Sequence, residues 1–143
     1  MMPKELAKAH ENGDLYFHDL DSYNLTINCL HIPTKEVLER GFNTGYGTIK
    51  KPKRIETAAE LSCILLQSSQ NDMFGGQSHA DFDNDLGVFI EPTRKEIRNE
   101  LIELGIDDKK IEAITEKKLK DKVHQAMQGI VYNLNTMHVR PVA

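Results

Sequence analysis

Residues 24–32, NLTINCLHI, are the one segment of this chain whose residue types alternate as a β-strand requires. One face of such a strand would carry every second side chain, namely Leu25, Ile27, Cys29 and His31. Both faces mix apolar and polar residues, which favours a strand beside a lined cavity. A strand without neighbours leaves its backbone N–H and C=O groups unpaired. We therefore expect a segment of a larger fold, whose further strands lie downstream.

Most of the remaining chain has helical patterns, so the expected fold class is α/β, mostly helical in this segment. The expected helices are residues 3–13, 33–41, 55–71, 93–105 and 107–135, with apolar residues recurring at helical spacing. Gly41 stands where a left-handed cap would end the second helix, and Asp107 or Asp108 is a suitable N-cap for the last. Residues 42–54 and 72–87 are rich in glycine and polar residues, which predicts loops with little regular structure.

Composition excludes several classes of protein. The net charge of −4 argues against general nucleic-acid binding, because phosphate neutralisation needs a basic surface. Two cysteines make no disulfide framework, and no Cys/His spacing suggests a zinc site. The longest apolar run, CILL, is too short to cross a membrane, and the chain starts with no signal-peptide pattern. We expect one segment over residues 1–143, in the cytoplasm, with no metal site.

The two cysteines receive different interpretations. An unpaired cysteine is most often a small buried hydrophobe, and this reading suits Cys63, which stands among leucines and an isoleucine in a predicted helix. Cys29 is either such a residue or a redox or nucleophilic thiol that faces a cavity. Composition alone favours the first reading for both.

Three further groups of residues have two readings each. His18 with two nearby aspartates is a metal or acid/base cluster, or more simply a turn whose aspartates cap backbone N–H groups. Gly75 and Gly76 allow close approach of a ligand or another strand, but MFGGQSH lacks the ending of a P-loop. The run KKPKR is a solvated basic face, or an anion site at the start of a helix that holds a triphosphate. Its four basic residues are Lys50, Lys51, Lys53 and Arg54.

Five blocks together resemble the amino-terminal part of the catalytic barrel of anaerobic (class III) ribonucleoside-triphosphate reductases. They occur in the family's order and are GDLYFHDLD, TINCLHI, GFNTGYGTIKKPKRI, LLQSSQNDMFGGQSHADFD and VYNLNTMH. The resemblance implies the first part of a ten-stranded α/β barrel, incomplete without downstream strands, and an architecture shared with other glycyl-radical enzymes.

The resemblance also implies radical reduction of the ribose 2′-hydroxyl of ribonucleoside triphosphates to make deoxyribonucleotides. In this family a glycyl radical, installed by a radical-SAM activase, generates a thiyl radical on a mid-chain cysteine that abstracts the 3′-hydrogen. A second cysteine, on the first barrel strand, helps to reduce the intermediate, often with formate as reductant. Cys29 stands at that second position, so the resemblance reverses its interpretation in favour of function. His18, Asn28, Gly75 and Gly76 would lie near the substrate.

An allosteric site at the dimer interface, which binds ATP or deoxynucleoside triphosphates, is implied as well. Lys53 matches a lysine associated with that site, and Lys50 and Gln67 are its expected neighbours. The resemblance thus implies a homodimer, a nucleotide effector and an activase as partners, with no nucleic acid or membrane. No cofactor is expected to bind this segment directly.

The sequence departs from the family in ways that limit the activity expected. The 143 residues contain no glycyl-radical motif and no further cysteine for the thiyl radical or a zinc site. After VYNLNTMH the chain reads VRPVA, where relatives have a turn of small residues. We expect no catalysis by the segment alone. The alternatives are a nucleotide-binding dimerisation module, a segment of a formate-lyase-type enzyme, or a degenerate product without function.

Overall fold

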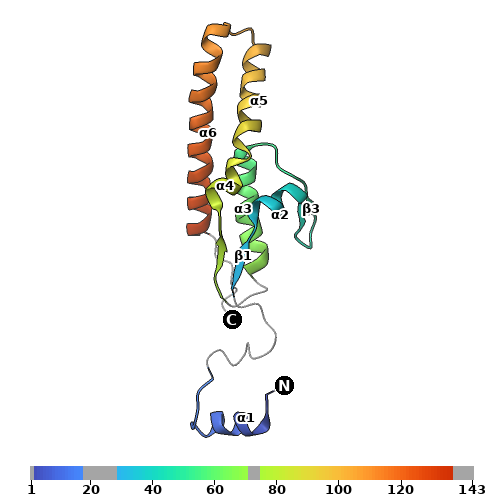
Figure 1. The fold of residues 1–143 in the computed structure, drawn as a ribbon, viewed down its shortest axis with the longest axis vertical. Coiled ribbons are helices and arrows are strands. Elements are labelled where there is room, and N and C mark those ends of the chain that lie inside the picture. The colour runs from blue at the N-terminus through green and yellow to red at the C-terminus, as the bar shows by residue number, and fades with distance from the viewer. Residues whose placement is uncertain (1, 18–28, 71–74, 137–143) are drawn as a thin grey trace.

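The computed structural model describes residues 2–17, 29–70 and 75–136, which are mostly helical with two small sheets (Figure 1). Both sheets are two-stranded, and the described residues form no closed barrel. The elements in chain order are α1 (Lys4–Glu11), β1 (Leu30–Ile32), α2 (Thr34–Arg40), β2 (Phe42–Asn43), β3 (Thr48–Ile49), α3 (Ile55–Gln70), β4 (Gln77–His79), α4 (Phe82–Gly87), α5 (Ile90–Glu103) and α6 (Asp108–Thr136).

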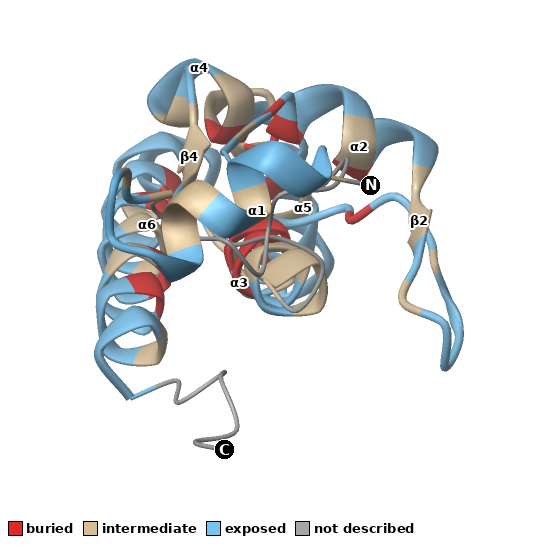
Figure 2. Cartoon of the chain, turned by 90° about the horizontal axis from the view of Figure 1, so that it is seen from below, coloured by how far each residue is buried: buried red, intermediate tan, exposed pale blue. Residues whose placement is uncertain are grey.

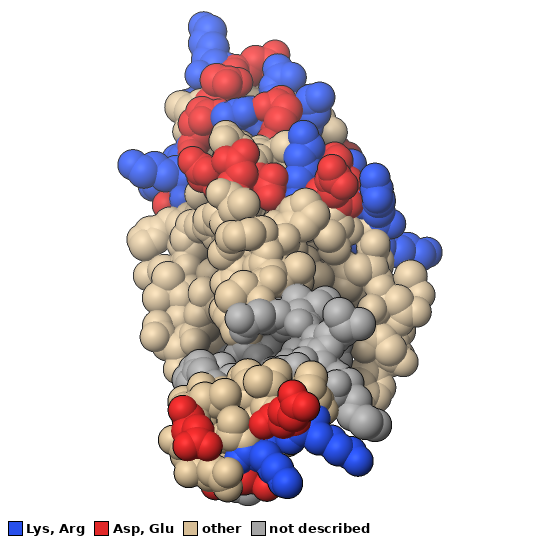
Figure 3. Space-filling model, turned by 60° about the horizontal axis from the view of Figure 1, so that its bottom comes forward, with Lys and Arg blue, Asp and Glu red and all other residues tan. Residues whose placement is uncertain are grey.

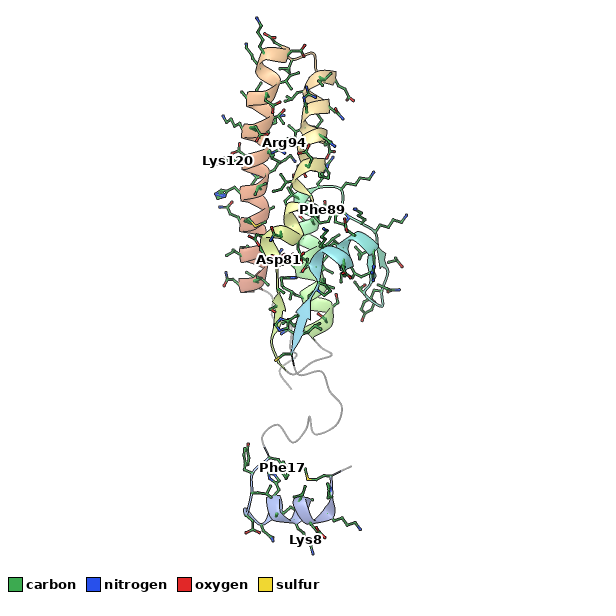
Figure 4. The ribbon with its side chains drawn as sticks, in the orientation of Figure 1. Lys8, Phe17, Asp81, Phe89, Arg94 and Lys120 are labelled. Atoms are coloured by element: carbon green, nitrogen blue, oxygen red, sulfur yellow. The ribbon has the colours of Figure 1, made fainter. Side chains whose placement is uncertain are left out.

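Helices α5 and α6 form the long antiparallel hairpin in the upper part of Figure 1. Gly105, with φ of +72°, makes the turn between them. The carboxylate of Asp107 accepts a 3.1 Å hydrogen bond from the backbone N–H of Lys109, which confirms an aspartate cap. Arg94 on α5, labelled in Figure 4, donates a 2.7 Å bond from Nε to the carboxylate of Glu116 on α6.

The apolar core consists of two clusters along one face of α6, whose buried residues share a single helical stripe. The first half of α6 packs on α5 through a cluster of Ile97, Leu101, Ile111 and Leu119. The second half of α6 packs on α3. There, Ala126 and Ile130 join a larger cluster that includes Leu38, Ile55, Cys63 and Phe89. Figure 2 shows these buried positions on the facing sides of the helices, with exposed residues around them. Full burial of each large apolar side chain contributes about 1.5–3 kcal/mol.

Strand β1 has a partner, β4, within these 143 residues, contrary to the prediction that the rest of a larger protein supplies its neighbouring strands. It pairs in parallel with β4, so that Leu30, His31 and Ile32 lie opposite Gln77, Ser78 and His79. Helix α3 lies in the connection between the two strands, which makes a βαβ unit.

The prediction of an irregular loop over residues 72–87 was therefore wrong in its described part, residues 75–87. That part contains β4 and α4. A strand of three residues is too short to show alternation, and its pairing with β1 supplies the stabilisation that the local sequence does not indicate. Helix α4 forms where Leu86 becomes buried in the core.

Residues 42–54, also predicted as a loop, contain the antiparallel hairpin of β2 and β3. The turn is closed by a 2.8 Å bond from the N–H of Gly45 to the side chain of Asn43. Gly41 has φ of +77° but ψ of +166°, a conformation that favours glycine but lies outside the left-handed helical region of the predicted cap. It brings the chain so close to β3 that a Cβ here would lie 2.3 Å from the carbonyl oxygen of Ile49.

The predicted helices are all present, with one clear difference in bounds. Helix α5 begins at Ile90 rather than at residue 93, so Pro92 falls in the first turn, where its missing N–H costs no hydrogen bond. The predicted stripe on α6 is buried or partly buried except at its end, where Leu134 is exposed. Helix α1 buries none of its residues and lies below the other described elements in Figure 1.

Candidate functional site

The parallel pairing brings Cys29 next to the glycine pair of the MFGGQSH block. The backbone N–H of Leu30 donates a 3.1 Å hydrogen bond to the carbonyl oxygen of Gly76. Continuing the register by one residue sets Cys29 opposite Gly76. A Cβ built on Gly76 would meet no atom within 4 Å, so the space beside the Cys29 backbone is open. Two blocks far apart in the sequence therefore meet at one end of the sheet.

The two faces of this small sheet have different surroundings. Gln77 faces α3, where its amide donates a 3.0 Å bond to the carbonyl oxygen of Leu66. Ile32 is 3% exposed on the same side, so this is the covered face. His31 and Ser78 point to the opposite face and are joined by a 2.6 Å hydrogen bond between Nδ1 and Oγ. His31 is exposed, which makes this the open face of the sheet.

Cys29 is exposed and directly precedes β1, whereas Cys63 is 1% exposed inside α3. Burial raises the pKa of the Cys63 thiol. The interpretation of Cys63 as a buried apolar residue is confirmed. By strand alternation Cys29 belongs to the same face as His31, two residues later. Its role near a substrate stays a prediction.

Among the described residues, the β1–β4 sheet and the second half of α3 carry no formal charge. Lys, Arg, Asp and Glu are absent from residues 29–34, 61–70 and 75–80, which include β1, β4 and most of α3. In Figure 3, the described residues between the charged side chains at the top of the view and those at the bottom are tan, so they include no Lys, Arg, Asp or Glu. A surface of this kind suits a neutral polar ligand or burial beneath further polypeptide.

On the covered face, His79 connects the sheet to α2. Its Nδ1 is hydrogen-bonded to the hydroxyl of Thr34, a residue that is fully buried. Its ring also lies 5.8 Å from that of Phe82. Burial lowers the pKa of His79, and the charge of Asp85 opposes that shift in part. Neither His79 nor the His31–Ser78 pair was singled out from the sequence, because the contacts that distinguish them are to residues more than forty positions away.

A second candidate site is a groove of about 1220 Å³ beside the start of α3. Two of the three predicted effector residues, Lys50 and Lys53, line it together. The groove continues along α5, whose contribution was not anticipated because it follows some forty residues later. The α5 side chains in the lining are Pro92, Lys95, Glu96, Asn99, Glu100 and Glu103.

Charge pairing reduces the number of cations that this groove offers. Arg54 forms a two-bonded ion pair with Glu96, one bond measuring 2.6 Å, and Lys51 binds Glu39 at 3.1 Å. Among the described residues, Lys50, Lys53 and Lys95 form no ion pair. Three lysines therefore remain available to an anion.

Backbone N–H groups at the N-terminus of α3 already have hydrogen-bond partners within the chain. The backbone N–H of Ile55 donates a 2.9 Å bond to the hydroxyl of Thr93. Burial would raise the pKa of Glu56, but its hydrogen bonds to Lys122 and to its own N–H hold that pKa below its usual value. An anion in the groove would therefore meet the lysine side chains rather than free N–H groups of the helix terminus. Gln67 lies twelve residues along α3, about 18 Å from Ile55, and does not line the groove.

Two of the predicted substrate residues, His18 and Asn28, lie outside the described residues. Gly75 is half-buried and precedes the paired Gly76. Within residues 2–17, 29–70 and 75–136, no three potential metal ligands gather closely enough to hold a metal ion. No helix in that part of the chain is long and apolar enough to span a membrane.

Comparison with known proteins gives one consistent result. The family model described as anaerobic ribonucleoside-triphosphate reductase matches residues 1–141. Proteins of that name from Salmonella typhimurium and Escherichia coli are each 29% identical over 140 residues, which is 96% of this chain but 19% of theirs. The protein of that name from Enterobacteria phage T4 is also 29% identical, and the match covers 23% of its length. The chain spans about a fifth of the length of the curated relatives it matches.

Proposed function

Because the chain belongs to the anaerobic ribonucleoside-triphosphate reductase family, we propose that it forms the amino-terminal part of such an enzyme's catalytic barrel. In this proposal it supplies Cys29 to the reduction of ribonucleoside triphosphates to deoxyribonucleotides. The observation that carries the proposal is the parallel pairing of β1 and β4, which sets Cys29 beside Gly76 on an uncharged, open sheet face.

The sheet supports this placement because parallel strands are normally covered on both faces. Helix α3 lies over one face, as the helices do on the outside of an α/β barrel. The other face would then point to the barrel interior, towards the substrate sugar. Further strands, from the remaining four-fifths of the family's length, would complete the ten-stranded barrel around it.

Within that chamber each of the predicted site residues has its own role. The Cys29 thiol would donate a hydrogen atom to the sugar radical, and the thiyl radical left on its sulfur would be reduced with formate as the final reductant. Gly75 and Gly76 would let the nucleotide approach the backbone, with His18 and Asn28 nearby. The glycyl radical, the activase that installs it and formate would supply the radical chemistry from outside these residues.

A chimeric enzyme tests the proposal. Residues 1–141 of this chain would replace the matching segment of the Escherichia coli relative, and deoxynucleotide formation would be measured anaerobically with activase and formate. We expect turnover in the chimera and loss of it in the Cys29→Ser variant. Cys63→Ala is the matched control, since it removes the buried thiol and should leave turnover in place. Turnover that survives Cys29→Ser would contradict the proposal.

The isolated chain provides a simpler check. Supplied with ribonucleoside triphosphate, formate and activase, it should form no deoxynucleotide, because the residues for radical generation are not among its 143. Measurable product from the purified chain would overturn this part of the proposal.

A second function is favoured by the groove: a nucleotide-responsive dimerisation module, which would bind ATP or a deoxynucleoside triphosphate. The three uncommitted lysines could hold a triphosphate, and the groove is large enough for a nucleotide. Sedimentation velocity with and without dATP tests this. We expect dATP to strengthen dimerisation, Lys53→Ala to weaken the effect, and Lys118→Ala, an exposed lysine on α6, to leave it unchanged. If the fraction of dimer is the same with and without dATP, the chain is not a nucleotide-responsive dimerisation module.

A further inference from the structure

Resting on the proposed function, we propose that His31 and Ser78 form a sugar-binding pair on the face that carries Cys29. In this arrangement His31 contacts the hydroxyls of the nucleotide's ribose through Nε2. Ser78 is a positioning residue that holds the imidazole ring in place. Among the described residues, this is the one side-chain hydrogen bond that joins the two strands on the open face.

The position of the pair follows from the register. His31 and Ser78 are direct neighbours across the parallel strands, and their side chains leave the sheet on the side away from α3. The 2.6 Å bond to Ser78 uses Nδ1 of the imidazole ring. Nε2 is therefore left for another group, with the ring plane fixed by the serine. Cys29 precedes His31 by two residues, about 7 Å along an extended chain.

The chemistry of the surroundings selects the ligand group. A phosphate would need Lys or Arg nearby, and none occurs in residues 29–34, 61–70 or 75–80. The uncommitted lysines lie in the groove at the start of α3, not on this sheet. An imidazole nitrogen and a hydroxyl are suited instead to the uncharged, two-way hydrogen bonding of sugar hydroxyls.

The pair also has a geometric advantage over a single side chain. Exposed histidines sample several rotamers, and that freedom is lost when a ligand binds. The cross-strand bond restricts His31 before the sugar arrives, so less entropy is lost on binding. Gly76, one residue before β4, leaves room for the sugar beside Cys29.

Protection of Cys29 from alkylation tests the inference in the chain itself. A Cys63→Ala parent contains Cys29 as its single thiol, so iodoacetamide labelling reports on that position. CTP and cytidine should both slow labelling, whereas inorganic triphosphate and 2′,3′-dideoxycytidine should not. Protection by inorganic triphosphate equal to that by CTP would contradict recognition of the sugar.

The variants separate the roles of the two residues. His31→Gln should abolish protection, and Ser78→Ala should raise the cytidine concentration for half-protection about fivefold, the factor that one net hydrogen bond represents. Ser78→Thr keeps a hydroxyl and should restore protection, a rescue that a purely structural role would not require. His124→Gln, at an exposed histidine on α6, is the control and should behave as the parent.

Two outcomes overturn the inference without deciding the proposed function. One is protection that persists in His31→Gln, and the other is failure of cytidine to protect Cys29 in the parent. The reductase function is judged separately, by turnover of the chimera and its loss in Cys29→Ser. A chimera that turns over but is insensitive to His31→Gln would leave that function standing and remove the sugar-binding pair.

Discussion

The hydroxyl of Thr93, on α5, accepts a 2.9 Å hydrogen bond from the backbone N–H of Ile55, the first residue of α3. The same hydroxyl donates a 2.7 Å bond to the carbonyl oxygen of Phe89. Thr93 is 1% exposed, so both bonds are shielded from water. A side chain of α5 thus caps the N-terminus of α3. This contact fixes the start of α3, and with it the groove-lining lysines just before it, relative to α5.

Thr93→Val tests this contact with a substitution that keeps the side chain's shape. The variant removes the acceptor and leaves the N–H of Ile55 unsatisfied in the core, which we expect to cost about 1–3 kcal/mol of unfolding free energy. Chemical denaturation followed by circular dichroism measures the change. Thr57→Val, at an exposed position on α3, is the control and should change stability by less than about 0.5 kcal/mol. Equal effects would show that the cap does not matter.

Alanine substitutions at Gly41 and Gly45 distinguish the effect of a steric clash on stability from the effect of backbone strain. Both have positive φ, so alanine at either position costs about 1 kcal/mol or more. At Gly41 the new Cβ would also meet the carbonyl oxygen of Ile49 at 2.3 Å, whereas at Gly45 it meets nothing within 4 Å. Gly41→Ala should therefore lower the melting temperature clearly more than Gly45→Ala. A reversed order would contradict the close approach of Gly41 to β3.

The ion pair of Glu56 and Lys122 connects α3 to α6. Because the pKa of Glu56 is held below its usual value of about 4.3, its stabilisation is present above that pH and is lost as pH falls through the lower folded value. Lys122→Met should cost about 1 kcal/mol at pH 7, and the difference from the parent should shrink near pH 3. Lys120→Met, an exposed neighbour, should show no such dependence. Denaturation curves at both pH values decide the point.

His79 predicts a second pH effect. Burial lowers its folded pKa, so below its ordinary value of about 6.5 the unfolded chain takes up a proton before the folded chain does. Stability should therefore fall as pH drops from about 6.5 through the folded pKa. His79→Gln should flatten this dependence between pH 7.5 and 5, although it also loses the bond to Thr34. His124→Gln serves as the control, and an unchanged slope in His79→Gln would exclude the effect.

Sequence patterns predicted the helices because their determinants are local. The apolar spacing of α3 and α6, the cap at Asp107 and the burial of Cys63 all follow from residues within a few positions of one another. The early start of α5 escaped prediction because Pro92 looked like a boundary, when it fits equally well inside a first turn.

The candidate sites were predictable only as residue types. Lys50 and Lys53 were recognised from the basic run, and the structure brings them into one groove. The α5 side of that groove, and the ion pairs that occupy Lys51 and Arg54, depend on a helix some forty residues away. Gln67 was grouped with the lysines, yet its position along α3 separates it from them in this chain.

By itself, the amino-acid sequence determined where every described helix except α4 forms and which residue types are available for chemistry, since each helical hydrogen bond joins residues four apart. The tertiary structure alone decided that Gln77–His79 is a strand, that it lies beside Leu30–Ile32, and that His31 meets Ser78. Strand hydrogen bonds join residues of any separation, so no local pattern specifies their register. The register becomes fixed only when α3 packs over one face and leaves the other, with Cys29, open.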